Sequence, residues 1–177
     1  MALARRALEH FELERLVVMV AGIPPHKPAA VAAERRFRLA EVAFARVPRV
    51  ELSRFELERD GAAYTVETAR YAKAMWGETI FLVGADEFAD FLSWHEPDAI
   101  LEVARLGVAT RPGTALERLD SVLRALRRPE RVEFFALDPV DISSRDLRRR
   151  VASGESIDGF VPGGVAALVS ELDLYRG

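Results

Sequence analysis

Cysteine is missing from the 177 residues, and histidine occurs only three times. A chain without cysteine has no disulfide framework, no thiolate metal site and no cysteine nucleophile. The histidines, His10, His26 and His95, are not spaced as the ligands of a metal site. The sequence also lacks G-x-G-x-x-G, G-x-x-x-x-G-K-[ST] and G-x-S-x-G. These absences exclude the dinucleotide fingerprint, the P-loop and the serine-hydrolase elbow.

Long apolar runs and a strong charge bias are absent as well. No run approaches the roughly 18–20 apolar residues of a membrane-spanning helix, and the charged segment Met1–Glu14 is unlike a secretory signal. A net charge of −3 and a pI of 5.7 are untypical of a protein that coats nucleic acid. Because 50% of the residues are hydrophobic, a sizeable core is possible. We therefore expect a soluble cytoplasmic protein without a nucleic-acid or membrane partner.

Apolar runs of strand length alternate along the chain with amphipathic segments of helix length. The predicted strands are Leu16–Ala21, Val50–Ser53, Thr79–Val83, Gly107–Thr110 and Val132–Leu137. The predicted helices are Ala2–Glu14, Ala30–Ala45, Thr65–Trp76, Phe88–Leu92, Pro97–Leu106, Ala115–Arg127, Ser144–Ala152 and Gly163–Leu172. This alternation predicts an α/β fold, with a Rossmann-like open parallel sheet flanked by helices. We expect a single domain over residues 1–177, with a small helical lobe from about residue 140.

The residues that follow each strand are the first candidates for a site, because ligands bind beyond the carboxyl ends of parallel strands. Pro24-Pro25-His26-Lys27 follows the first strand. Its imidazole and ammonium groups suit a phosphate or carboxylate, although a plain surface turn explains the same residues. Gly84-Ala85-Asp86 follows the third strand, where the Asp86 carboxylate either meets a ribose hydroxyl or a metal-bound water, or caps a helix.

Two further segments carry groups suited to a nucleotide. The Trp94 indole, next to His95, either stacks on a flat ring or belongs to the core. Serines at the predicted helix start at Ser144, followed within a turn by Arg148, indicate an anion site; a simple N-cap with Asp146 is the alternative. From the residues alone, the chain is an anion- or nucleotide-binding α/β protein.

Taken together and in order, these segments resemble the bacterial nicotinate-nucleotide adenylyltransferases of the nucleotidyltransferase superfamily over essentially the whole chain. The matching segments are Pro24–Lys27 (PPHK), Glu56–Thr68 (E-L-x-R-x-G-x-S-Y-T-x-x-T, with Ala63 in place of serine), Gly84–Trp94 (G-x-D…W), Arg111–Gly113 (R-P-G), Ile142–Arg148 (I-S-S-T-x-I-R, with Arg145 and Leu147 in place of threonine and isoleucine), Val161-Pro162 and Leu174-Tyr175.

The resemblance implies a transfer of the adenylyl group of ATP to nicotinate mononucleotide, which gives deamido-NAD and pyrophosphate in NAD biosynthesis, with Mg²⁺ bound to ATP. It implies the following contacts: nicotinate mononucleotide at Thr65, Val66, Trp94, His95 and Arg111; phosphate at His26 and Lys27; ATP at Gly84, Asp86, Ile142, Ser143, Ser144 and Arg148. No nucleophile, base or protein metal ligand is implied in this chain. Such transfers depend on positioning and charge stabilisation.

One part of the family pattern is missing. The first strand of these enzymes, with its G-x-F-x-P-x-H-x-G-H motif, falls before Met1, and Ala2–Phe11 resembles the helix that follows it. We therefore expect the full-length gene product to be the enzyme and these 177 residues alone to be inactive. The alternatives are a non-catalytic nucleotide-binding relative, or an adenylyltransferase for nicotinamide mononucleotide or phosphopantetheine. A homo-oligomer is possible.

Overall fold

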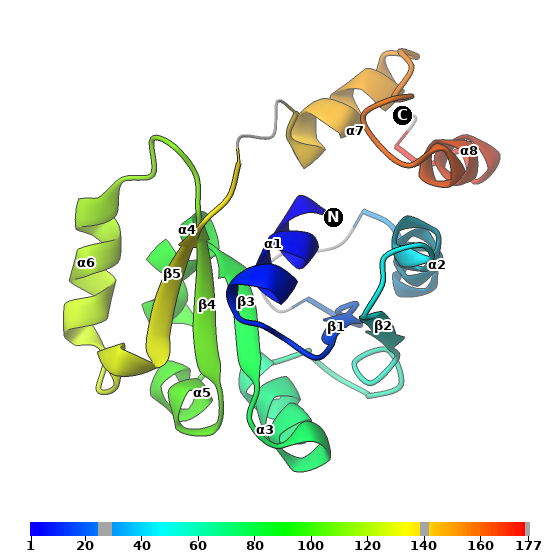
Figure 1. Cartoon of the computed structure of the whole chain (residues 1–177). Helices are drawn as coiled ribbons and strands as arrows, with labels where there is room; N and C mark the ends of the chain where they lie inside the picture. Colours follow the sequence, from blue (N-terminus) through cyan, green and yellow to red (C-terminus); the bar gives the residue numbers. More distant parts are fainter. Residues whose placement is uncertain (25–29, 139–141, 176–177) are drawn as a thin grey trace. The chain divides into compact units, whose positions relative to one another are not determined.

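The computed structural model describes residues 1–24, 30–138 and 142–175, and the chain forms two compact units. The first unit consists of Met1, Glu14–Ala62 and Val140–Gly177, and the second of Ala2–Leu13 and Ala63–Pro139. Each unit therefore combines stretches that are far apart in the sequence (Figure 1). The predicted single domain with a C-terminal lobe stays a prediction.

Parallel strands and helices alternate as the sequence predicts. The first unit contains β1 (Leu16–Met19), α2 (Ala33–Phe44), β2 (Val50–Ser53), α7 (Ser144–Ala152) and α8 (Gly163–Glu171). The second unit contains α1 (Ala2–His10), α3 (Thr65–Trp76), β3 (Ile80–Gly84), α4 (Ala85–Ala89), the 3-10 helix η1 (Phe91–Ser93), α5 (Pro97–Val103), β4 (Arg105–Thr110), α6 (Leu116–Ala125), the 3-10 helix η2 (Pro129–Arg131) and β5 (Val132–Ala136). The α/β fold class is confirmed.

The described strands form two parallel sheets rather than one. One sheet has the order β1-β2 and the other the order β3-β4-β5. Apolar patterns mark a strand but do not say which strands pair, so this division was not visible in the sequence. The helix predicted at Phe88–Leu92 also differs. It begins earlier, at Ala85, directly after β3, and a 3-10 turn follows it.

The core of the second unit lies on one face of the three-stranded sheet. The register pairs Val83 with Val108, and Val108 with Phe134, so these side chains share that face. Helices α3, α4, α5 and α6 cover it with apolar residues, among them Phe88 and Ile100, both 0% exposed. Burial of this kind is the main favourable contribution to folding.

Helix α1 packs against the opposite face of the same sheet. The Phe11 ring, just after α1, meets the Phe135 ring edge-on at 5.2 Å between centroids. A Cβ built on Gly107 of β4 would lie 2.8 Å from the Phe11 ring and from Leu82 Cδ2. Glycine at position 107 therefore allows the close approach of the aromatic ring to the sheet.

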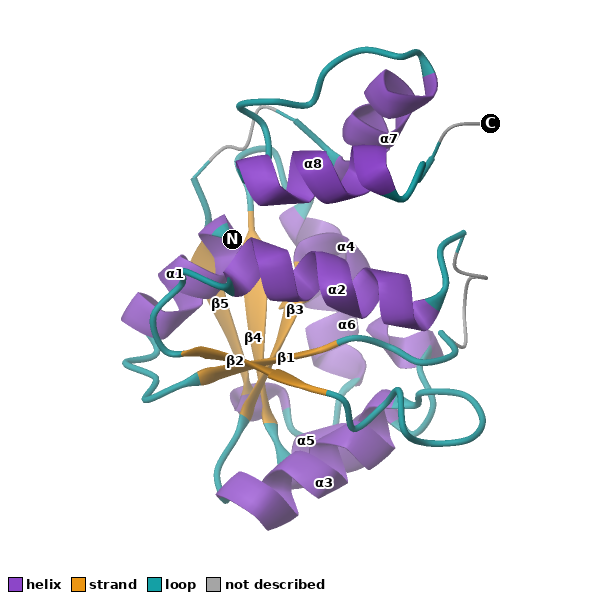
Figure 2. Cartoon of the chain, turned by 90° about the vertical axis from the view of Figure 1, so that its right-hand side faces the viewer, coloured by secondary structure: helices purple, strands orange, loops and turns teal. Residues whose placement is uncertain are grey.

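The first unit combines the two-stranded sheet with a helical core. Strands β1 and β2 pair in register from Leu16 with Val50 to Met19 with Ser53. Helices α2 and α8 lie side by side (Figure 2). Val151, Ile157 and Val169 form the centre of this helical core, with Leu39 of α2 packed against them. The predicted C-terminal helices thus share a core with α2.

No helix among the described residues is long and apolar enough to cross a membrane.

Candidate functional site

The start of α3 in the second unit presents backbone donors that its own helix does not use. The Glu67 and Thr68 N–H groups donate to the Tyr64 carbonyl oxygen at 3.1 and 3.3 Å. Tyr64, the N-cap residue, makes no side-chain cap, and the N–H groups of Thr65 and Val66 have no acceptor within the helix. Because the Val66 side chain is buried in the core, these two donors are held in place.

Trp94 and His95 lie beside this helix start. The backbone N–H of Trp94 donates to the Phe91 carbonyl oxygen at 3.0 Å. The Trp94 ring meets the Phe81 ring edge-on, with 6.4 Å between the ring centroids. The indole is half-buried, so it both packs on the core and keeps an accessible part. The His95 ring lies 4.5 Å from the Tyr64 ring at 36°. The contact between Tyr64 and His95 thus brings the Trp94-His95 segment to the start of α3.

Gly84, Asp86 and Arg111 belong to the carboxyl edge of the three-stranded sheet. Gly84 pairs with Ala109, and β4 ends one residue later, before Arg111. Gly84 is the N-cap residue of α4 and Asp86 is an exposed first-turn residue, where a carboxylate is favoured by the helix dipole. Within the described part of the chain, the Asp86 side chain makes no hydrogen bond.

The exposed Arg111 begins a tight turn that Thr114 closes. The Arg111 N–H donates to Thr114 Oγ1 at 3.0 Å, and that hydroxyl donates to the Arg111 carbonyl at 2.7 Å. Gly113 takes a φ of +86°, which favours glycine.

The start of α7, in the first unit, is closed by a capping box. Ser143 Oγ accepts from the Asp146 N–H at 3.1 Å, and the Asp146 carboxylate accepts from the Ser143 N–H at 3.2 Å. Hydrogen bonds from the Ser143 side chain and backbone lower the pKa of Asp146 below its ordinary value. Ser143 is therefore the N-cap residue of α7, and its predicted contact with ATP stays a prediction. Ile142 is half-buried and Ser144 is exposed.

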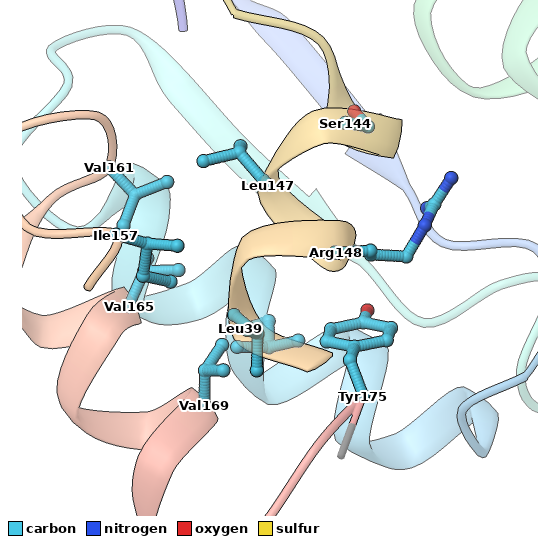
Figure 3. Close-up of a pocket in the computed structure, with 10 residues that line it drawn as sticks. Leu39, Ser144, Leu147, Arg148, Ile157, Val161, Val165, Val169 and Tyr175 are labelled. Atoms are coloured by element: carbon cyan, nitrogen blue, oxygen red, sulfur yellow. The ribbon is translucent and has the colours of Figure 1, made fainter. Parts of the chain in front are cut away.

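Arg148 differs from the arginines that follow it. Arg149 pairs with Asp146 at 2.8 Å, and Arg150 pairs with Glu155 at 2.9 Å. Arg148 has no ion-pair partner among residues 1–24, 30–138 and 142–175. Arg148 and Ser144 border a cavity of about 180 Å³ between α2, α7 and α8 (Figure 3). Apolar side chains of these helices form most of the rest of the cavity lining.

Two predicted contacts, His26 and Lys27, lie outside the described residues. Within the described ranges, no group of three or more His, Asp or Glu side chains is arranged to hold a metal ion. Tyr64, whose ring packs against that of His95, is a candidate site residue that the sequence analysis named only as part of a motif. The clue to Tyr64 in the sequence was its position directly before the predicted helix Thr65–Trp76.

The model of the cytidylyltransferase-like family matches residues 1–150. The fold and this match define the class: the chain is a nucleotidyltransferase with an α/β fold.

Proteins named probable nicotinate-nucleotide adenylyltransferase narrow the family further. The one from Thermus thermophilus is 37% identical over 98% of this chain and 89% of its own length. The one from Rubrobacter xylanophilus is 35% identical over 99% of this chain and 85% of its own length. The chain belongs to the nicotinate-nucleotide adenylyltransferase family.

Solved structures agree with the fold. A nicotinic acid mononucleotide adenylyltransferase of Plasmodium falciparum complexed with APC is 12% identical, with a TM-score of 0.69 over 99% of this chain and 88% of that one. The same enzyme complexed with NaAD gives 0.70 at 13% identity, over 92% of this chain and 83% of that one. At this identity the likeness concerns the fold.

Proposed function

We propose that this protein transfers the adenylyl group of ATP to nicotinate mononucleotide, forming deamido-NAD and pyrophosphate in NAD biosynthesis. The observation that carries the proposal is the 37% identity over 98% of the chain to a protein named for this reaction. The cytoplasm, where ATP and pyridine nucleotides are available, is part of the proposal. A homo-oligomer is compatible with it.

The nicotinate half of the substrate is assigned to the start of α3. The N–H groups of Thr65 and Val66 suit its carboxylate, because free first-turn donors and the helix dipole favour an anion. Trp94 supplies the stacking face, and the backbone at His95 completes the carboxylate contacts. Such N–H donors favour a carboxylate over an amide, so nicotinate is preferred to nicotinamide. Arg111 belongs to the polar surroundings.

The proposed ATP contacts are those that the family resemblance implies. Gly84 and Asp86 suit the ribose or adenosine, since glycine admits a close approach and the exposed carboxylate accepts from a hydroxyl. Ile142 and the serines at 143 and 144 are assigned to adenine and the phosphates, with the Ser143 side chain also capping α7. Arg148, which has no ion-pair partner in the described part of the chain, is the cation for a phosphate oxygen. His26 and Lys27 are assigned to a phosphate.

The reaction is an in-line displacement at the α-phosphorus of ATP. A phosphate oxygen of nicotinate mononucleotide forms the new P–O bond while the bond to the β-phosphate oxygen breaks and pyrophosphate leaves. ATP enters as its Mg²⁺ complex, because Mg²⁺ is commonly held by substrate phosphates and few protein carboxylates. This chain contributes positioning and charge stabilisation, which dominate transfers of this kind.

Pyrophosphate release from Mg²⁺-ATP and nicotinate mononucleotide tests the proposal. The same assay with nicotinamide mononucleotide or phosphopantetheine separates it from the related activities. Binding of nicotinate mononucleotide without pyrophosphate release would favour a non-catalytic relative.

A further inference from the structure

The Glu96 carboxylate bridges two side chains beside the start of α3. Arg70, on α3, donates from Nη2 to Glu96 Oε2 at 2.9 Å. On the other side, His95 Nε2 lies 3.4 Å from Glu96 Oε1. The bridge therefore joins helix α3 to the segment that follows Trp94.

A second contact joins the same two parts of the chain. The His95 ring packs against the Tyr64 ring at the N-cap of α3, six residues before Arg70. Helices α3 and α5 also pack against each other (Figure 2). The Trp94-His95 segment is thus attached to α3 at two points along the helix, one at its start and one further along.

The backbone of Glu96 is itself constrained. Its φ of 50° and ψ of 59° are left-handed, a conformation that costs energy for a residue other than glycine. As the N-cap residue of α5, its carbonyl accepts from the Ala99 and Ile100 N–H groups at 3.1 and 3.3 Å. Ile100 is fully buried, which anchors this turn in the core. Strained residues held by their surroundings cluster at functional sites.

We propose that Arg70 and Glu96 are positioning residues that hold the Trp94-His95 segment against the start of α3 and so set the affinity for the nicotinate half of the substrate. This inference rests on the proposed function, because it takes Trp94 and the start of α3 as the place where the nicotinate half binds. The side chains of Arg70 and Glu96 are 53% and 48% exposed. Exposed pairs of this kind add little to stability, so removing this one should leave the melting temperature near the wild-type value.

The test compares Arg70→Gln and Glu96→Gln with wild type. Calorimetry gives the Kd for nicotinate mononucleotide, and steady-state assays give kcat and the two KM values. We expect the Kd and the KM for nicotinate mononucleotide to rise by up to about fivefold, the scale of one lost exposed contact. The KM for ATP, kcat and the melting temperature stay near the wild-type values. The double variant is expected to be no worse than either single one, and Arg70→Lys to recover part of the affinity.

Arg127→Gln is the matched control. Arg127 is also exposed in the second unit, and its Nε lies 3.4 Å from Oδ2 of Asp98 on α5. This variant loses an ion pair that also ties α5 to another segment, and we expect it to bind as wild type does. If wild type binds nicotinate mononucleotide and both glutamine variants bind it with the same Kd, the inference is overturned and the proposed function stands. A wild-type protein that neither binds nicotinate mononucleotide nor releases pyrophosphate overturns the proposed function, and the inference with it.

Discussion

Replacing Gly22 with alanine is expected to destabilise the first unit, because backbone atoms occupy the space that a side chain needs. A Cβ at position 22 would lie 2.3 Å from the Glu56 carbonyl oxygen and 3.2 Å from its carbonyl carbon. A backbone carbonyl cannot rotate away as a side chain can. The clash can therefore be avoided only if the main chain shifts, either at residue 22 or at Glu56.

The surroundings oppose that shift. Arg36 donates from Nη2 to the Gly22 carbonyl at 3.0 Å and from Nε to the Val31 carbonyl at 3.1 Å. One residue after Gly22, Ile23 forms an isolated parallel bridge with Ala62. Overpacking of this kind typically costs about 1–3 kcal/mol. With about 2–4 °C lost per kcal/mol for a chain of this size, a cost near 2 kcal/mol lowers the melting temperature by roughly 4–8 °C.

Thermal unfolding followed by circular dichroism measures this effect. Gly163→Ala is the control, because nothing lies within 4 Å of a Cβ at that position and Gly163 begins α8. We expect the control to melt at or slightly above the wild-type temperature, since alanine is the better helix former. A Gly22→Ala protein that melts within about 1 °C of wild type would refute the steric argument.

Trp94→Ala removes the proposed stacking face, so nicotinate mononucleotide should bind about 10- to 100-fold more weakly in calorimetry, the equivalent of roughly 1–3 kcal/mol. Trp76→Phe should leave that Kd unchanged. Thr79→Val removes a buried hydroxyl that has no hydrogen-bond partner among the described residues; we expect a gain of about 1 kcal/mol and a higher melting temperature, and a lower one would contradict this. Ser143→Ala loses the cap of α7 and should cost about 1 kcal/mol in thermal unfolding. Because its folded-state pKa is lowered, Asp146 stabilises the fold at neutral pH, and this contribution is lost as the pH falls through the lowered pKa. Melting temperatures measured from neutral to acid pH should therefore fall less steeply in Asp146→Asn than in wild type, and parallel curves would contradict the capping role.

The elements of the fold were predictable because their signals are local. The helix Thr65–Trp76 and the strand Val50–Ser53 were predicted with the bounds that the structure has. Periodicity of apolar residues within about ten positions contains this information. The position of Gly84 and Arg111 at strand ends followed from the same patterns, since both come directly after an apolar run.

The candidate site was predictable in part. Trp94 and His95 do lie beside the start of α3, as the family resemblance implied. Ser143 was predicted as either an anion ligand or a cap. The structure shows the cap, formed with Asp146, and the anion contact stays a prediction. Whether a cap forms depends on side-chain geometry, which residue types at a helix start leave open.

The sequence by itself determined the alternating strands and helices, the family and the segments that bear site residues. Only the tertiary structure decided that the strands divide into two parallel sheets and that the last helices share a core with α2. It also decided that Arg70 meets Glu96, 26 positions along the chain. Pairing between distant segments depends on the packing of the whole fold, and no local pattern of side chains encodes it.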